Sequence, residues 1–566
     1  MTQYHNRTMK KKFRTSLAIT ALIGSVFLFV RAGDDYFEIS KNLDIFASLY
    51  REINTNYVDD TKPGELMKTG IEAMLSSLDP YTNYIAESQI EDYRFMTTGQ
   101  YGGIGALIQK REDQILITET YDGFPAQTSG LLIGDRIISI DGKNVVGKST
   151  SEISEFLKGQ PKTAVDLEVE RGTGDAMKKM NFKLERAEIK IHDVPFYNMV
   201  NEEVGYIRLT GFTQSASSEF AAAFKDLKEN FSMKSLVIDL RGNGGGLLRE
   251  SVSIVNFFVE KGTPVVSTRG KLKEWEKEYN ALANPIDVDI PIVVLVDRNS
   301  ASASEIVAGS IQDLDRGVII GRTTYGKGLV QQTVDLSYNS KLKVTVAKYY
   351  TPTGRCIQKL NYSDRNAQGN AREIPDSLIS EFKSLKFGRP LFDGKGIKPD
   401  IEIKNETYSN IAVGILKKYH VFDFSTDFRL RNETISSANE YNVSDELFGE
   451  FKSYIGSQDF AYETNAEVLL DELKASTEEE HYYNEIEQEY HELQHKLLEV
   501  KSKDLDKHKK EIKTILANEI VLRYYNQKGQ LEYSLKNDPY LDSALVVLGN
   551  MEKYNAILKG VNTPDE

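Results

Sequence analysis

Residues 291–313 constrain the fold of this chain more than any other stretch. The run Pro291-Ile-Val-Val-Leu-Val-Asp297 is short and continuously apolar, which is typical of a strand buried in a parallel sheet. Residues 304–313 then repeat apolar side chains with helical spacing. A buried strand that turns into a helix predicts an α/β sheet, with Ser302 at the turn between the two elements.

Ser302 is a candidate nucleophile and Lys327 a candidate base. At a strand-to-helix turn the first N–H groups have no intrahelical partner, so an oxyanion formed by attack of Ser302 on a carbonyl could be held there. A serine hydroxyl needs a base to take its proton, and an unperturbed lysine has a pKa of about 10.4. Lys327 must therefore be desolvated to serve as the base.

The residues around Lys327 permit this role. Gly326 and Gly328 let the backbone approach closely, and a strand predicted at residues 329–336 places Gln331 two alternations beyond Lys327 on the same face. Gln331 could hold the amine without adding a counter-charge. The alternative is that the serines of this segment are ordinary N-cap and first-turn residues and the lysine is a surface charge.

A glycine run follows a second predicted strand. Residues 235–240 have the pattern of a buried strand, and Gly242, Gly244, Gly245 and Gly246 come directly after it. Ligands bind at the carboxyl ends of strands in open α/β sheets. Glycines leave backbone N–H groups unshielded, so this loop can donate to an oxyanion, and a plain tight turn is the alternative.

Six motifs in chain order closely resemble those of the carboxyl-terminal processing (tail-specific) peptidases. They are Ser77-Leu-Asp-Pro-Tyr81, Val237-Ile-Asp-Leu-Arg-Gly-Asn-Gly-Gly-Gly246, Ser300-Ala-Ser-Ala-Ser-Glu305, Thr324-Tyr-Gly-Lys-Gly328 with Gln331, Tyr350-Thr-Pro-Thr-Gly-Arg355 and Gly396-Ile-Lys-Pro-Asp400. By this resemblance Ser302 is the nucleophile, Lys327 the base and Gln331 the residue that orients the lysine. The resemblance also implies an oxyanion hole made by the N–H groups of Gly246 and Ala303.

Residues 97–186 resemble a PDZ domain, with a glycine-rich start, several short apolar runs and a helix near Ser149–Leu157. In that family a peptide tail adds as a strand to a sheet edge, and a loop donates N–H groups to its carboxylate. Gly102, Gly103, Ile104 and Gly105 would form this loop. A PDZ domain that only packs on the catalytic domain is the alternative.

The resemblance implies an α/β fold with a crotonase-like protease core, an inserted PDZ domain, an N-terminal helical region and a C-terminal helical extension. The predicted domains are a signal peptide or signal anchor at 1–34, the helical region at 35–96, the PDZ domain at 97–186, the protease core at 187–405 with an insertion near 361–390, and the extension at 406–566. We expect the extension to be structural or to act in assembly.

Two other motifs suggest competing chemistry. His491-Glu492-Leu-Gln-His495 is a full HExxH zinc motif, with Glu519 as a candidate third ligand. Its flanks are strongly charged and typical of a solvated helix, whereas a zinc site needs a buried helix with oriented partners. Residues 321–328 nearly match a phosphate-binding loop, but a glycine replaces the magnesium-binding hydroxyl and a strand pattern follows.

Charge, cysteine content and the N-terminal segment further restrict the function and location that the sequence allows. A formal net charge of −14 without a concentrated basic face argues against nucleic-acid binding. Cys356 is the sole cysteine, which rules out intrachain disulfides, and we expect it to be a packed thiol. Residues 10–14 are basic and precede an apolar stretch at 17–30, which is typical of an export signal. The body of the protein would then lie in the cell envelope, facing the periplasm, with the inner membrane as the site of an uncleaved anchor.

These observations together predict a serine endopeptidase that cleaves exported proteins near their C-termini and requires no metal or organic cofactor. The competing classes are a non-catalytic PDZ scaffold and a zinc peptidase that uses His491, Glu492 and His495. The expected partners are protein substrates bound through their C-termini. A homodimer and an adaptor protein are open alternatives for further assembly.

Overall fold

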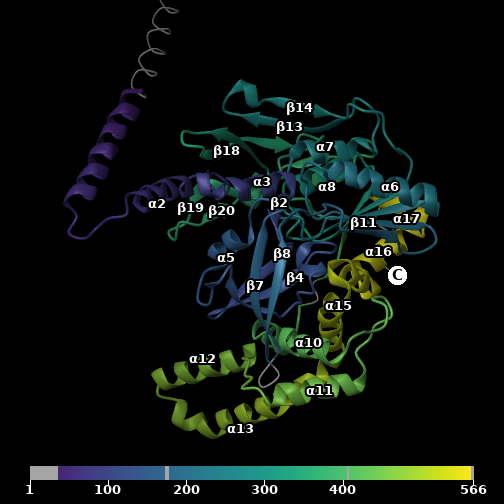
Figure 1. Ribbon diagram of the computed structural model, residues 1–566. Helices are drawn as coiled ribbons and strands as arrows, with labels where there is room; N and C mark the ends of the chain where they lie inside the picture. The colour runs from purple at the N-terminus through teal and green to yellow at the C-terminus, as the bar shows by residue number, and fades with distance from the viewer. Residues whose placement is uncertain (1–35, 173–176, 405–406, 562–566) are drawn as a thin grey trace, which may run out of the picture. The chain divides into compact units, whose positions relative to one another are not determined.

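The computed structural model describes residues 36–172, 177–404 and 407–561 (Figure 1). The described residues form two compact units, which divide between residues 84 and 85. In the first unit, residues 36–56 and α2 (Pro63–Ser76) are helical, as expected for the N-terminal region. The signal segment expected at residues 1–34 lies outside the described residues. Among the helices that are described, none has the length and apolar character needed to cross a membrane.

The second unit is built on a six-stranded sheet. Its strands in spatial order are β10 (Phe196–Met199), β11 (Val204–Arg208), β12 (Ser235–Asp239), β15 (Ile292–Val296), β16 (Val318–Gly321) and β23 (Ile401–Glu402). β10 is antiparallel to β11, and all other neighbours are parallel. β12 and β15 are buried along their whole length, which confirms the two strands predicted from apolar runs.

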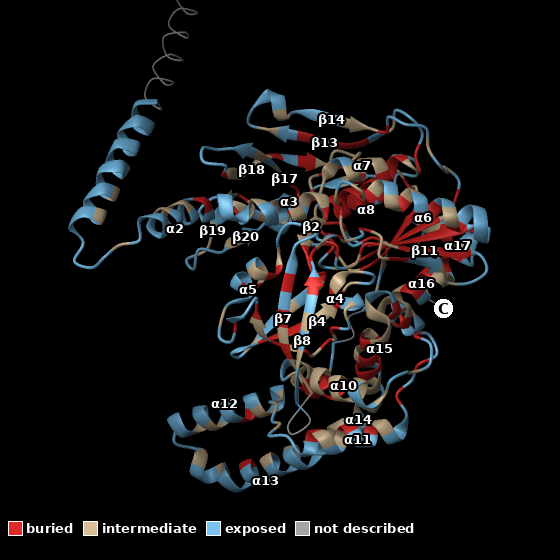
Figure 2. Ribbon diagram, in the orientation of Figure 1, coloured by how far each residue is buried: buried red, intermediate tan, exposed pale blue. Residues whose placement is uncertain are grey.

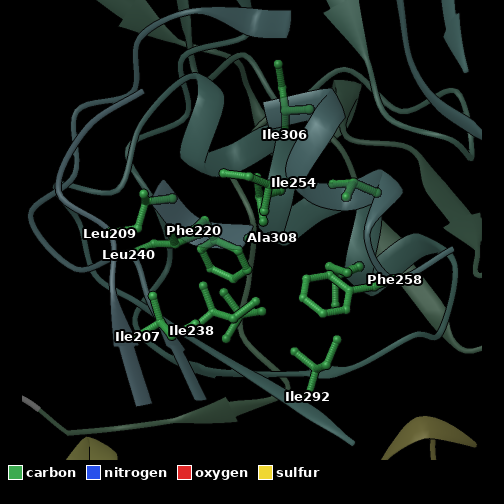
Figure 3. Packing of buried hydrophobic residues seen from close by; sticks show 14 of the residues in the cluster. Ile207, Leu209, Phe220, Ile238, Leu240, Ile254, Phe258, Ile292, Ile306 and Ala308 are labelled. Atoms are coloured by element: carbon green, nitrogen blue, oxygen red, sulfur yellow. The ribbon is translucent and has the colours of Figure 1, made fainter. Parts of the chain in front are cut away.

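Helices cover both faces of this sheet. One face is covered by α6 (Ala216–Phe231), α7 (Leu248–Asn256) and α8 (Ala303–Asp313), and the other by α16 (Pro539–Leu548) and α17 (Met551–Leu558). Successive residues of a strand face opposite sides. Accordingly, Ile207, Ile238 and Ile292 pack in the first cluster (Figure 3), while Val237 and Val293 pack in the second.

Helix α8 is buried at every residue. Its carboxyl end is bound by residues of two of the family-like motifs, 350–355 and 396–400. Arg355 donates from Nε to Asp313 Oδ1 (2.9 Å), and the two side chains are 1% and 0% exposed. Gln312 donates to Asp400 Oδ1 (3.0 Å). Removing one partner of such a buried ion pair typically costs about 3–5 kcal/mol. These motifs therefore fix the helix whose opposite end carries Ser302.

A second sheet lies next to the lysine segment. β13 (Pro264–Gly270) pairs with β14 (Lys277–Asn280) and β18 (Lys341–Tyr350), and β18 also pairs with β17 (Leu329–Asp335). The predicted insertion near residues 361–390 contains two small hairpins. They are formed by β19 (Leu360–Arg365) with β20 (Ala371–Glu373), and by β21 (Glu381–Lys383) with β22 (Pro390–Phe392).

The PDZ-like segment has its own sheet and core. The sheet order is β3 (Ala106–Arg111), β4 (Gln114–Thr120), β5 (Arg136–Ile140), β7 (Ala164–Arg171) and β8 (Lys178–Glu185), with β6 (Lys143–Asn144) on β5. Helix α3 (Ile90–Thr98) precedes this sheet in the chain and leads into β2 (Gln100–Gly103). β2 pairs with β9 (Ala187–Lys190). The helices are α4 (Pro125–Thr128) and the expected α5 (Thr150–Leu157), whose N-cap Ser149 accepts a hydrogen bond from Glu152 N (3.3 Å).

The C-terminal extension is helical, as expected, and it divides into two parts. The first has its own apolar core and contains α9 (Asn410–Lys417), α10 (His420–Arg431), α11 (Asp445–Gly456), α12 (Asn465–Glu479), α13 (Tyr483–Lys501), α14 (Asp504–Lys507) and α15 (Lys509–Ser534). Figure 2 shows that α12 and α13 are largely exposed. The second part, α16 and α17, belongs to the core of the six-stranded sheet.

Candidate active site

Ser302 lies at the turn between β15 and α8, as the sequence predicts. Its backbone φ is 58° and its ψ is −112°, a conformation that costs a non-glycine residue about 1–3 kcal/mol and recurs at functional sites. The Ser302 N–H donates to Glu305 Oε2 (2.8 Å). The turn thus holds the serine in a strained conformation at the amino end of a buried helix, where negative charge is favoured.

The two neighbouring serines have structural roles. Ser300 Oγ donates to the carbonyl of Leu240 (2.9 Å), and Ser304 Oγ donates to the carbonyl of Asn243 (2.9 Å). Both acceptors lie just beyond the carboxyl end of β12. These bonds tie the serine turn to the glycine loop.

The glycine loop approaches the serine turn closely. Asn243 is fully buried, and its carbonyl accepts from Ala301 N (3.0 Å) while its Oδ1 accepts from Gly245 N (2.9 Å). Gly245 has φ +97, and a Cβ there would lie 2.8 Å from Ser302 Cβ and 2.9 Å from Ala303 N. Only glycine allows this approach, which brings the loop next to the first N–H of α8.

Glu305 joins the serine turn to the lysine segment. Besides Ser302 N, its carboxylate accepts from Thr324 Oγ1 (2.6 Å), Gly326 N (2.7 Å) and Lys327 N (2.9 Å). The side chain is completely buried. Glu305 was not predicted as a site residue, although Ser302-x-x-Glu305 at a helix start fits the capping-box pattern that could have identified it.

Burial also changes the protonation of Glu305. Loss of water raises the pKa of this carboxyl to about 7, while the hydrogen bonds from Thr324, Lys327, Ser302 and Gly326 act in the opposite direction. The effect of desolvation on the pKa therefore exceeds the combined effect of the four hydrogen-bond donors. The carboxyl that aligns the two segments changes its charge near neutral pH.

The strand register does not support the alternation argument for Gln331. Lys327 precedes β17, which begins at Leu329, and the register of β17 against β18 shifts between Val330 and Gln331. Simple alternation therefore does not place Lys327 and Gln331 on one face. The amide of Gln331 donates to Thr345 Oγ1 (3.2 Å) on β18, and its role toward the lysine stays a prediction from the family resemblance.

The HExxH motif does not form a buried site. His491, Glu492 and His495 are exposed on α13, and Glu519 accepts from Arg523 Nη1 (2.7 Å). Among the described residues, no group of three or more His, Cys, Asp or Glu side chains is placed to hold a metal ion. A zinc peptidase is not favoured.

The other two alternative sites also lack supporting geometry. Residues 321–328 lead into strand β17, whereas a phosphate-binding loop needs a helix at that point. Cys356 is partly buried, and desolvation raises the pKa of its thiol, so the reactive thiolate is disfavoured.

The predicted carboxylate loop divides between a strand and a turn. Gly102 and Gly103 belong to β2 and pair with β9, while Ile104 and Gly105 form the turn that leads into β3. Gly105 has φ +76. β3 pairs only with β4 among the described strands, so its other edge is open to an added strand.

Three family models match separate parts of the chain. The model described as peptidase family S41 matches residues 203–363, and a PDZ domain model matches residues 116–171. A model described as the C-terminal helical domain of a probable PDZ-protease matches residues 411–548.

Curated proteins and a solved structure are also similar to this chain. A carboxy-terminal-processing protease of Bartonella bacilliformis is 36% identical over 321 residues, covering 56% of this chain and 73% of that protein. A probable CtpA-like serine protease of Staphylococcus aureus is 32% identical over 376 residues, covering 66% of this chain and 67% of that protein. The structure of a photosystem II D1 C-terminal processing protease is 27% identical, covers 64% of this chain and 92% of that chain, and has a TM-score of 0.34.

The close approach at Gly245 gives a first prediction. We expect Gly245→Ala to lower kcat/KM for peptide hydrolysis by about 100-fold or more, because the new Cβ must displace the Ser302 turn. Gly244→Ala is the matched control, since a Cβ at that position meets no atom within 4 Å. Steady-state kinetics and circular dichroism would compare the variants. Equal activity of the two would contradict the prediction.

Glu305 gives a second prediction, on stability. Because its folded pKa is about 7 against an ordinary 4.5, its contribution to stability is fully present below about pH 4.5 and is lost as the pH rises through 7. We expect the free energy of unfolding of the wild type, relative to Glu305→Gln, to fall by roughly 3 kcal/mol between about pH 4.5 and pH 8. Urea titrations at several pH values measure this difference. A difference that is constant or rises with pH would refute the assignment.

Proposed function

Because the chain belongs to peptidase family S41, the carboxy-terminal-processing serine proteases, we propose that Ser302, Lys327 and Gln331 are its catalytic residues. The protein is a serine peptidase with a PDZ domain. The observation that carries the residue assignment is the Glu305 carboxylate, which binds the backbone of both Ser302 and Lys327. Two segments that are distant in sequence are thereby held at one position.

The proposed reaction uses the serine and the amine in turn. Ser302 Oγ attacks the scissile carbonyl carbon while neutral Lys327 Nζ takes the hydroxyl proton. The tetrahedral intermediate collapses, the C–N bond breaks, and Lys327 returns the proton to the leaving amine. Water then attacks the acyl-enzyme with Lys327 again as base, which releases the new carboxyl end and restores Ser302.

The proposed oxyanion hole consists of Gly246 N–H and Ala303 N–H. Its support is local: Ala303 is the first residue of α8, and the glycine loop packs against the turn that precedes it. Backbone donors at a helix start are already oriented and add the favourable end of the helix dipole.

We also propose that the PDZ domain binds the C-terminus of the substrate at the open edge of β3. The tail would add as a strand beside Ala106–Arg111, and its carboxylate would meet the turn at Ile104 and Gly105. α5 packs next to β3 and would form the other wall of the groove. This arrangement would retain a substrate by its tail while cleavage occurs at Ser302.

Cell-envelope location follows from the N-terminal sequence. The basic residues at 10–14 and the apolar stretch at 17–30 support export of the body to the periplasm, with the segment either removed or kept as an inner-membrane anchor. Exported proteins are then the substrate class.

The N-terminal region supports a homodimer. Large apolar side chains are exposed along residues 36–58, namely Tyr36, Phe37, Ile39, Leu43, Ile45, Phe46, Leu49, Ile53, Tyr57 and Val58. Clusters of this kind usually mark an interaction surface. A second copy of the chain is the proposed occupant, and an adaptor protein is the alternative.

The catalytic assignment is tested with an unfolded model protein that has an apolar C-terminus. Ser302→Ala and Lys327→Ala should each lower the cleavage rate by about 1,000-fold or more, because the nucleophile or its base is missing. A zinc chelator should leave wild-type activity unchanged, as should the His491→Ala, His495→Ala double substitution. Cleavage that survives in both dyad variants would reject the assignment.

Tail recognition is tested by binding, without turnover. Full-length Ser302→Ala should bind a peptide with a free apolar C-terminus about tenfold or more tightly than the amidated peptide, because N–H donors bind a charged carboxylate more strongly. Fluorescence anisotropy measures both affinities. Gly105→Ala, whose Cβ would lie 2.5 Å from Phe124 Cβ, should remove the preference, whereas Gly123→Ala, at φ +77 with no atom within 4 Å, should keep it. Equal affinities for the two peptides would disprove tail recognition.

A further inference from the structure

A residue of the C-terminal extension binds the residue that begins the glycine loop. Asp538 is the N-cap of α16, and its carboxylate receives two bonds from Arg241: Nη1 to Oδ1 (3.0 Å) and Nη2 to Oδ2 (2.5 Å). The ring of Tyr540 lies 4.7 Å from the same guanidinium. Two-point Arg–carboxylate contacts fix orientation as well as distance.

This contact belongs to a buried cluster of charges at the carboxyl end of β12. Arg241 also binds Asp239, which in turn accepts from Arg208 (2.6 Å) and from the hydroxyl of Tyr206 (2.6 Å). The Asp239 and Asp538 side chains are 0% and 8% exposed, and the two arginines are 17% and 18% exposed. Two carboxylates therefore balance two guanidinium groups.

The cluster fixes the position from which the glycine loop starts. Arg208 Nη2 donates to the carbonyl of Arg241 (2.6 Å), and the next residue, Gly242, donates from N to Asp297 Oδ1 (2.9 Å). The loop then runs over four residues to Gly246. A shift at Arg241 would reach the Ser302 turn through Asn243, whose carbonyl accepts from Ala301 N and Ser304 Oγ and whose Oδ1 accepts from Gly245 N.

We propose that Asp538 is a positioning residue for the oxyanion-binding loop and acts through Arg241. The inference rests on the proposed function, since it requires the loop at Gly246 to bind the oxyanion. It gives the C-terminal extension an indirect part in catalysis, through the position of the glycine loop, in addition to covering the sheet.

The physical reason is a local charge balance. Without the Asp538 carboxylate, the cluster keeps two guanidinium groups against one carboxylate, and Arg241 loses its outer anchor. Arg241 keeps its bonds to Asp239, and repulsion between the two guanidinium groups shifts Arg241 together with the backbone carbonyl that Arg208 binds. Misplacement of donors weakens the transition state, where the oxyanion exists, and leaves ground-state binding of the substrate unchanged.

The test separates this role from support of the fold. Asp538→Ser keeps an N-cap side chain for α16 but is too short to reach Arg241, and Asp538→Asn keeps the shape and removes the charge. Asp445→Asn is the control, because Asp445 is a salt-bridged residue of the same extension whose partners, Lys509 and Lys513, also lie within it. Active sites are titrated with a fluorophosphonate, so that kcat refers to folded enzyme only. A peptide boronate, which forms a tetrahedral adduct, measures the oxyanion site.

For Asp538→Ser we expect kcat per titrated site to fall by about 10- to 100-fold, KM to stay within about twofold, and the boronate Ki to rise by the same factor as kcat falls. Asp538→Asn should show a smaller fall in kcat and a matching smaller rise in the boronate Ki. If the serine variant does not fold, the asparagine variant alone tests the inference. Asp445→Asn should match the wild type.

The inference is overturned if kcat per titrated site is unchanged in Asp538→Asn or Asp538→Ser, since any loss of activity would then reflect unfolded protein. It is also overturned if KM rises while the boronate Ki does not. Activity that persists in Ser302→Ala would instead reject the catalytic assignment itself, so the two failures are distinguishable.

Discussion

The buried carboxylate of Glu305 is the contact on which the geometry of the active site depends. Ser302 and Lys327 come from different elements, and neither element alone brings them together. Glu305 accepts from both backbones and from Gly326 and Thr324, so a shift of either segment breaks a hydrogen bond inside the protein. An unpaired buried donor costs about 1–3 kcal/mol, which makes such displacements rare.

The sheet is the second requirement, and it explains why the chain needs its C-terminal extension. β12 and β15 end side by side, and their carboxyl ends carry the glycine loop and the Ser302 turn. Both strands are buried on both faces, and α16 and α17 supply one of those faces. The extension therefore contributes to the core that positions the site, which a purely attached module would not do.

Much of the site could be predicted from the sequence, and the parts that could not have physical causes. Apolar runs indicated β12 and β15, and helical spacing indicated α8, because burial on both faces leaves a clear pattern. Gln331 was placed by alternation, which fails where a bulge shifts the register. Glu305 was overlooked although it completes a capping-box pattern with Ser302, because that pattern predicts a helix start and not the bonds to Thr324, Gly326 and Lys327. Asp538 was missed because its partner, Arg241, lies far away in the sequence.

Burial also distinguishes a sequence motif that forms a functional site from one that matches a pattern by chance. The HExxH sequence of α13 is complete, yet its side chains are exposed, and Glu492 accepts from Gln488 on the same helix and not from a buried partner that would orient a zinc ligand. Ser302, by contrast, lies at a strained turn against a buried helix, and the neighbouring hydroxyls of Ser300 and Ser304 are bound to the segment that follows β12. The Ser302 site is reactive because its backbone donors are held in position before a substrate binds. Donors that are already in position need no reorganisation during the reaction. The same reasoning gives weight to Asp538, which is nearly buried and bound at two points, over the many exposed acidic residues of the extension.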